Sequence, residues 1–264
     1  METTTRSQFL DDYRTIRHAE GRGSDDPAYY LALPYEDLNG TNASQWKIRG
    51  KTYRFFERKI LRVVEKRLKR PLDILDLGAG NCWMSYRLSL RDHKPVALDI
   101  FSDARDGLLA SRHYPRPFPV IEAQFDNLPF PKRSFDLAIF NASFHYSSDY
   151  HHTLREVRRC LRPRGRVVIL DSPLYVRPEH GELMRAERRR HFLKRYGFPS
   201  DALASREYLD EPMLKTLARD LGIEWKMYRV WYGWKWFLRP WEARLRRSRP
   251  PSRFVILTGA FKGR

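Results

Sequence analysis

The chain has 264 residues, of which 42% are apolar, so it is long enough to build one large domain or two small ones around a hydrophobic core. No segment approaches the roughly 18 uncharged apolar residues of a membrane-spanning helix. Residues 1–14 lack the apolar stretch of a secretory signal. Two cysteines, Cys82 and Cys160, cannot build a disulfide framework, and their spacing does not indicate a metal site. We therefore expect a reduced, cytoplasmic protein that binds no metal.

The charge balance is strongly basic. Fifty Lys and Arg against 32 Asp and Glu give a formal net charge of +18. Such an excess suits the phosphates of RNA or DNA, an anionic membrane surface or an acidic substrate. An arginine-rich composition inherited from a GC-rich genome would give the same excess without any partner, so charge alone does not choose among these interpretations.

The first 70 residues predict a helical cap. Residues 1–44 are polar and punctuated by Gly and Pro, which favours a short helix followed by loops. Apolar residues then recur at helical spacing from Ser44 until Pro71, where a helix must stop.

From residue 72 the chain alternates short apolar strands with helices. This alternation is typical of βαβ units, which form a parallel sheet with helices on both faces. We expect strands at 72–77, 95–100, 117–123, 134–142 and 165–171, and helices at 83–90, 103–113 and 150–161. Residues 174–204 read as an insertion with a basic helix, after which a helix at 207–221 and strands at 223–231 and 253–261 complete the chain. The sequence thus predicts a doubly wound, mostly parallel seven-stranded sheet over residues 71–264, with an N-terminal helical lid and an insertion after the fifth strand.

The strongest local motif is a glycine-rich turn after the first strand, DLGAGNC at residues 76–82. Gly78 and Gly80 allow a tight turn and a close approach of a ligand to the backbone. A dinucleotide-binding fold competes at this point, but its fingerprint requires a third glycine where this chain has Trp83. Asp99 ends the second strand, where a carboxylate can accept hydrogen bonds from two ribose hydroxyls.

Four segments in unbroken order over residues 72–173 resemble the class I S-adenosylmethionine-dependent methyltransferases. They are DILDLGAG, VALDI, FDNLPFPKRSFDLAIFNASFHY and LREVRRCLRPRGRVVILDSP. They are most similar to the small-molecule branch that includes the methyltransferases of ubiquinone and menaquinone biosynthesis. The resemblance implies S-adenosyl-L-methionine as cofactor and a Rossmann-like fold.

The resemblance also implies roles for single residues. Those implied to border the methionine and sulfonium part of the cofactor are Asp76, Gly78, Ala79 and Gly80, and Asn141 is implied to face the methyl group. Asp99 is implied to bind the ribose, with Ile100, Gln124 and Phe125 around the adenine. This chain departs from the family pattern at Cys82, where the family has a third glycine, and at Gln124, where it has an acid.

Trp46, Arg49 and Tyr53 share one helix face because they are spaced i, i+3 and i+7. This face either closes over the cofactor, with Arg49 pairing its carboxylate, or consists of a solvated arginine beside two core aromatics. His145 follows the strand that ends at Asn141, on the acceptor side. It is our candidate catalytic base for an acceptor that must lose a proton, and a pocket-lining or structural role competes.

The segment 228–241, YRVWYGWKWFLRPW, interleaves tryptophans with basic residues. Three interpretations remain open for it: a loop on an anionic membrane surface, a platform that stacks RNA bases, or aromatics that finish a strand. The sequence as a whole favours methyl transfer at O, C or N of a small-molecule or lipid-like acceptor, with possible peripheral contact with an anionic membrane. An RNA methyltransferase is the alternative, with nucleic acid a less favoured partner, and a non-catalytic binding protein of the same fold is a further one.

Overall fold

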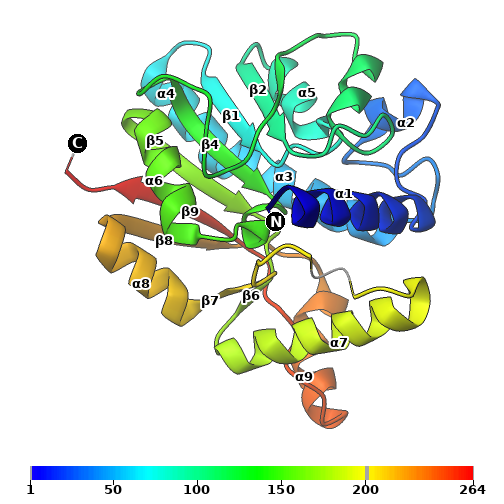
Figure 1. Cartoon of the computed structure of the whole chain (residues 1–264). Coiled ribbons are helices and arrows are strands. Elements are labelled where there is room, and N and C mark those ends of the chain that lie inside the picture. Colours follow the sequence, from blue (N-terminus) through cyan, green and yellow to red (C-terminus); the bar gives the residue numbers. More distant parts are fainter. Residues whose placement is uncertain (1, 200–201, 264) are drawn as a thin grey trace.

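The computed structural model describes residues 2–199 and 202–263, and its centre is one seven-stranded sheet (Figure 1). The strand order is β3-β2-β1-β4-β5-β9-β8. The five strands from β3 to β5 are parallel, and β9 runs antiparallel to both β5 and β8. The strands are β1 (Asp73–Leu77), β2 (Lys94–Asp99), β3 (Val120–Glu122), β4 (Phe135–Asn141), β5 (Leu161–Leu170), β8 (Ile223–Arg229) and β9 (Val255–Phe261). The predicted fold class is confirmed.

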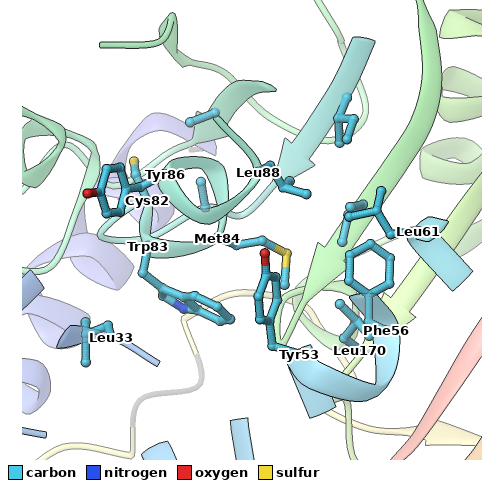
Figure 2. Close-up of a cluster of buried hydrophobic side chains, with 14 of the residues drawn as sticks. Leu33, Tyr53, Phe56, Leu61, Cys82, Trp83, Met84, Tyr86, Leu88 and Leu170 are labelled. Atoms are coloured by element: carbon cyan, nitrogen blue, oxygen red, sulfur yellow. The ribbon is translucent and has the colours of Figure 1, made fainter. Parts of the chain in front are cut away.

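Helices cover both faces of the sheet because the central strands are apolar on both sides. Successive residues such as Ile74 and Leu75 belong to two different hydrophobic clusters, one on each face. One face is covered by α3 (Ala43–Phe56), a π-helical turn (Glu57–Leu61), α4 (Arg62–Leu68) and α5 (Trp83–Ser89), whose side chains interlock in Figure 2. The other face is covered by α6 (Tyr150–Cys160) and α8 (Glu211–Leu221).

The N-terminal 70 residues contain more helix than the sequence predicts. Helix α1 (Glu2–Ala19) is followed by α2 (Pro27–Ala32), which begins after Asp26, whose side chain accepts a hydrogen bond from the Ala28 amide. The helical run predicted between Ser44 and Pro71 is confirmed: α3, the π-turn and α4 follow one another without a break and end at Lys69 in the left-handed conformation.

Residues 103–113 and the segment after β5 differ from the sequence prediction. The helix expected at 103–113 is only a 3-10 turn (Leu108–His113), because Asp103 accepts hydrogen bonds from the amides of Arg105 (2.8 Å) and Asp106 (2.9 Å) and closes a loop instead. A second 3-10 turn covers Phe144–Tyr146. After β5, a short strand β6 (Leu174–Tyr175) pairs with β7 (Leu209–Asp210), and the insertion helix α7 (Pro178–Tyr196) lies between them in sequence.

The aromatic segment near the C-terminus forms a helix. Strand β8 ends at Arg229, and α9 (Trp234–Leu245) begins after Gly233, which has a φ of +107°. The interpretation that the tryptophans finish a strand is therefore wrong, because the segment leaves the sheet before Trp231. Among residues 2–199 and 202–263, no helix combines the length and the apolar character needed to cross a membrane.

Candidate functional site

A cavity of about 1020 Å³ opens at the carboxyl ends of the parallel strands. Loops after β1, β2, β4 and β5 contribute to its wall, as parallel α/β sheets require of a ligand site. The predicted site residues that line it are Trp46, Arg49, Gly78, Ala79, Gly80, Asp99, Ile100, Gln124, Phe125, Asn141 and His145. The fold therefore brings together segments that are up to a hundred residues apart in sequence.

Gly78 is held against the neighbouring strand. It has a φ of +73°, and a Cβ placed there would lie 2.3 Å from the Cβ of Ser143. The Ser143 hydroxyl donates a hydrogen bond to the Leu77 carbonyl, and the Gly78 amide donates to Leu98 (2.7 Å). No residue with a side chain fits at Gly78 because of this close packing. Gly78 and Gly80 therefore present only backbone atoms to the cavity.

Asp99 sits beside this loop with part of its hydrogen-bonding capacity in use. One carboxylate oxygen accepts from the Gly80 amide (2.8 Å) and the other from the Phe101 amide (3.0 Å). A carboxylate has about four acceptor positions, so about two remain for a ligand. Burial raises the pKa of Asp99, while the backbone hydrogen bonds favour its ionised form.

Asp76 lies behind the glycine loop and does not line the cavity. Its carboxyl accepts a hydrogen bond from Ser85 (2.7 Å) on one oxygen, and no partner for the other oxygen is found among the described residues. Burial, with the nearby charge of Asp99, raises the pKa of Asp76 to about 7. The structure therefore does not bring the Asp76 carboxyl to the cavity wall, where the family resemblance implied that it borders the cofactor, but holds it buried against Ser85 of α5.

The predicted helix face in α3 is divided between two environments. Trp46 and Arg49 line the cavity, and the Arg49 guanidinium lies 5.3 Å from the Trp46 ring centre. Burial lowers the pKa of Arg49, and no hydrogen-bond or ion-pair partner for its guanidinium occurs in the part of the chain that the structure describes. Tyr53 faces away from the cavity and packs edge-on against Trp83 in the hydrophobic cluster, with ring centres 5.5 Å apart (Figure 2). The expected role of Tyr53 at the site does not match its position, because this ring is part of the core.

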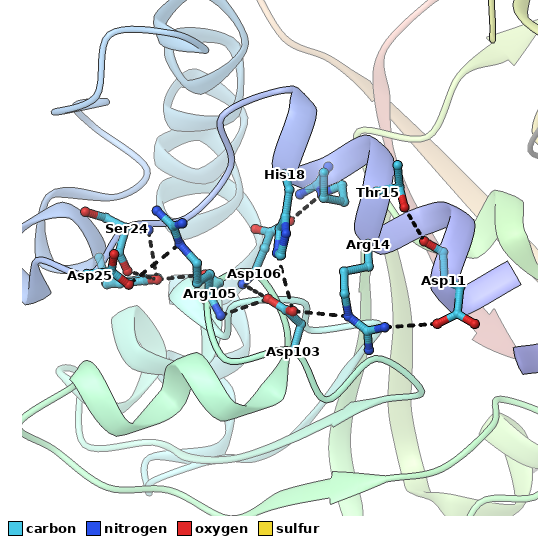
Figure 3. A network of polar contacts seen from close by, with 11 residues as sticks. Asp11, Arg14, Thr15, His18, Ser24, Asp25, Asp103, Arg105 and Asp106 are labelled. Carbon is cyan, nitrogen blue, oxygen red and sulfur yellow. Dashed lines mark hydrogen bonds and ion pairs between the residues drawn. The ribbon is translucent and has the colours of Figure 1, made fainter. Parts of the chain in front are cut away.

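Helix α1 lies over the cavity and is tied to the loop after Asp99. Arg17 forms an ion pair with Asp106, and both Arg14 and His18 approach Asp103 to 3.5 Å (Figure 3). On its inner side, Tyr13 packs edge-on against Phe101 at 5.1 Å. Helix α1 also packs on the opposite wall, where the rings of Tyr13 and Phe9 each lie 6.4 Å from that of Tyr146. The helix therefore bridges two loops on opposite sides of the cavity.

His145 also lines the cavity. Its Nδ1 lies 3.2 Å from the hydroxyl of Ser172, and its ring contacts Tyr146. Burial, assisted by the positive charges of Arg188 and Arg49, lowers the pKa of His145 to about 3. The imidazole is therefore neutral near pH 7 and is a weak base.

Asp171, at the end of β5, is a cavity-lining carboxyl that the sequence analysis did not select. It accepts a hydrogen bond from the Thr52 hydroxyl (2.7 Å), which also lies 2.8 Å from the hydroxyl of Tyr232. Burial raises the pKa of Asp171, and the charge of Arg49 opposes that shift. Its position after a predicted parallel strand, like that of Asp76 and Asp99, was the signal that could have found it.

Other cavity-lining residues come from segments that carry no family motif. Helix α1 contributes Phe9, Tyr13 and Arg17, whose i, i+4, i+8 spacing places them on one face, a pattern that was readable in the sequence. Ala202–Ala204 and Phe254 also reach the cavity, and no local pattern announces them because only the tertiary fold brings them there.

Residues 75–169 match a family model described as a methyltransferase domain. A demethylmenaquinone methyltransferase from Thermus thermophilus is 32% identical over 110 residues, which are 40% of this chain and 49% of that protein. A malonyl-[acyl-carrier protein] O-methyltransferase from Legionella pneumophila is 30% identical over 36% of this chain and 34% of that protein. The match therefore spans at most about half of the length of these relatives.

A solved structure of an S-adenosylmethionine-dependent methyltransferase from Mesorhizobium loti superposes with a TM-score of 0.55 at 19% identity. The superposition covers 84% of this chain and 99% of that one, and it shows that the fold extends well beyond the matched segment. The strand order, the glycine loop and the family match agree with one another. Residues 75–169 thus form a domain of the class I S-adenosylmethionine-dependent methyltransferase family, whose methyl-donating cofactor is S-adenosylmethionine.

Proposed function

We propose that this protein transfers a methyl group from S-adenosylmethionine to O, C or N of a small-molecule or lipid-like acceptor. The observation that carries the proposal is the single continuous cavity of about 1020 Å³. We assign the part lined by the glycine loop and Asp99 to the cofactor and the part lined by the neutral His145 imidazole to the acceptor. That volume lies at the upper limit of typical ligand sites, so a cofactor and an acceptor can occupy it together.

The residues at the glycine-loop end fit the cofactor. Asp99 has about two acceptor positions left, which matches the two hydroxyls of a ribose. Arg49, which has no ion-pair partner among the described residues, can bind the carboxylate of the methionine part bidentately, beside Trp46. Ile100, Gln124 and Phe125 are then left to surround the adenine. The bare backbone at Gly78, Ala79 and Gly80 admits the chain that joins these groups.

The acceptor end is built to position a substrate and to exclude water. The bound cofactor supplies a methyl group already activated on a sulfonium, so no nucleophilic side chain is required. Asn141 stands between the two ends, and Phe9, Tyr146 and Phe254 give this end an apolar wall. Holding an acceptor in line in such a pocket contributes roughly 7–11 kcal/mol to lowering the barrier.

We propose that His145 acts by hydrogen bonding and not as a strong base. Because its pKa is lowered to about 3, the neutral ring can accept or donate one hydrogen bond to an acceptor hydroxyl while Ser172 holds its Nδ1. An acceptor whose hydroxyl is already acidic suits this arrangement, since little proton affinity is then needed.

The apolar wall supports a lipid-like or aromatic acceptor, and two relatives are named for demethylmenaquinone and for malonyl-[acyl-carrier protein] as substrates. We propose peripheral contact with an anionic membrane as the setting in which such an acceptor is met. The net charge of +18 also favours RNA as a second candidate acceptor. We further propose that residues 1–70 act as a cap on the domain at 71–264. Helix α1 is then the lid, and residues 174–204 are an insertion beside the acceptor end.

Two measurements test the proposed function. Calorimetry with S-adenosylmethionine should give a one-to-one binding isotherm, and its absence for the wild-type chain would leave a non-catalytic protein of this fold. Cofactor carrying a labelled methyl group should then be incubated with lipid extracts and, separately, with RNA. Label in an organic-soluble product supports the proposal, and label in RNA alone overturns the acceptor class.

A further inference from the structure

Helix α9 turns an apolar face to solvent. The side chains of Trp234, Phe237, Leu238, Trp241 and Leu245 follow the i, i+3, i+4, i+7, i+11 spacing of one helix stripe and are 45–87% exposed. Trp231, 55% exposed, joins this stripe, with its ring centre 5.1 Å from that of Trp234 and 5.8 Å from that of Phe237. We call these six residues the α9 apolar face.

The opposite side of α9 fixes it to the body of the protein. Trp236 packs against Tyr232 at 5.2 Å and against Phe254 at 5.3 Å between ring centres. The Lys51 ammonium donates a hydrogen bond to the Tyr232 carbonyl (2.7 Å) and holds the segment that leads into the helix. The outward direction of the apolar face is thus set by packing on the inner side.

The segment that carries the α9 apolar face is rich in basic residues. Residues 229–249 contain seven Arg and Lys and one Glu, a net charge of +6. Arg249 forms an ion pair with Glu187 of α7 (2.7 Å), and α7 lies at the same end of the molecule as α9 in Figure 1. Helix α7 itself carries six Arg and Lys against three Glu, so it extends the positive surface.

Three kinds of partner can be compared with this surface. A second copy of the chain would bring two strongly positive helices together, which like-charge repulsion opposes. Single-stranded RNA stacks on separate, flat ring faces, whereas Trp234 packs edge to face with both Trp231 and Phe237. An anionic bilayer satisfies both features, because rings and leucines enter the headgroup region while arginines reach the phosphates.

We propose that α9 is an in-plane anchor that docks this protein on an anionic lipid bilayer through the α9 apolar face and its basic rim. This inference deepens the membrane contact proposed above and does not depend on the methyl-transfer activity. The proposed partner is the bilayer surface, not a soluble phosphate or a protein.

A single side chain, that of Phe254, lies between α9 and the cavity. Phe254 contacts Trp236 of α9 on one side and lines the cavity on the other. Tyr232 contacts Thr52, which in turn donates to the cavity-lining Asp171. Docking by α9 therefore holds the acceptor end of the cavity close to the bilayer, where a lipid-like acceptor has a short path to it.

The test is sedimentation of the full chain with vesicles of phosphatidylcholine, with and without half phosphatidylglycerol. We expect binding to the mixed vesicles that weakens with salt, and little binding to phosphatidylcholine alone. The triple variant Trp234→Ala, Phe237→Ala, Trp241→Ala should bind mixed vesicles at least about tenfold more weakly than the wild type. The matched control is Val63→Ala, Leu90→Ala, Leu109→Ala, which removes three exposed apolar side chains elsewhere and should bind like wild type.

Calorimetry with S-adenosylmethionine keeps this test separate from the proposed function. If the α9 variant loses lipid binding and keeps its cofactor affinity, the anchor stands whatever the acceptor is. Equal sedimentation of the α9 variant and the wild type overturns the proposal, as does failure of the wild type to bind mixed vesicles at low salt. A wild type that binds a single-stranded RNA oligonucleotide but not the vesicles would assign the surface to nucleic acid instead.

Discussion

The two ends of the cavity are built in different ways. At the glycine-loop end the chemistry is presented by the backbone and by one acid, and close packing at Gly78 and Ser143 fixes it. In the part that we assign to the acceptor, the wall consists of side chains from α1, from the 3-10 turn at Phe144–Tyr146, from Ala202–Ala204 and from Phe254. The first end therefore tolerates almost no change of sequence, whereas the second can change its specificity by exchanging side chains. The predictions below probe this contrast.

The largest effect is expected for Gly78→Ala. The added Cβ would overlap Ser143 at 2.3 Å in a left-handed backbone, so we expect a loss of about 3 kcal/mol or more in the free energy of unfolding. Gly40→Ala is the matched control, because Gly40 has nearly the same φ (+72°) and nothing within 4 Å of an added Cβ. It should cost about 1 kcal/mol. Urea unfolding measures both, and equal losses would show that the seam at Ser143 is not tight.

Asp76→Asn should change how stability depends on pH. Burial raises the folded-state pKa of Asp76 to about 7, above its value in the unfolded chain. The folded protein therefore keeps a proton that the unfolded chain loses between about pH 4 and 7, so stability falls as pH rises through this window. The variant cannot ionise, and its decline should be smaller by a few kcal/mol at most. Parallel pH profiles of wild type and variant, measured by thermal unfolding, would contradict this.

Asp99→Ala should weaken binding of S-adenosylmethionine by about 1.5–3 kcal/mol, the range for hydrogen bonds to a charged group. Asp210→Ala is the control, since Asp210 also accepts a backbone hydrogen bond, from the Met213 amide, but does not line the cavity. It should leave the affinity nearly unchanged. If calorimetry gives both variants the same affinity, Asp99 has no ribose role beyond shaping the loop.

The smallest effect concerns the lid. Arg17→Met removes the ion pair between α1 and Asp106, and we expect cofactor affinity to fall about threefold to tenfold, or roughly 1 kcal/mol. Amide hydrogen exchange in α1 should become faster in the same variant. Arg14→Met removes only the longer contact of an exposed side chain with Asp103 (3.5 Å), so its affinity should fall less than that of Arg17→Met. An unaltered exchange rate in Arg17→Met would mean that this pair does not hold the lid.

Most of the sheet and much of the glycine-loop end were predictable because local patterns specify them. Buried parallel strands are continuous apolar runs, and Gly78, Gly80 and Asp99 stand at strand ends, where their positions in the sheet follow from topology. The roles assigned to these residues remain predictions.

The periphery escaped sequence reasoning because contacts distant in sequence decide it. Tyr53 shares a helix face with Arg49, yet it packs on Trp83 in the core, a difference that spacing alone does not reveal. The composition of the segment after Arg229 also suits the continuation of a strand. In the structure the chain turns at Gly233 and forms a helix in which Trp236 packs on Phe254. The proposed lid role of α1 rests on contacts with Asp103 and Asp106, which lie almost ninety residues away from Arg17.

Strands β8 and β9 pair at seven positions, so the hairpin is held by its own ladder and not by the 230–254 excursion that joins them. No side chain of α9 is buried, and the entropy of closing a loop rises only slowly with its length. A descendant could therefore lengthen, shorten or replace α9 while the sheet stayed intact. The proposed membrane anchor and the proposed methyl-transfer site are therefore encoded in largely separate stretches of the gene.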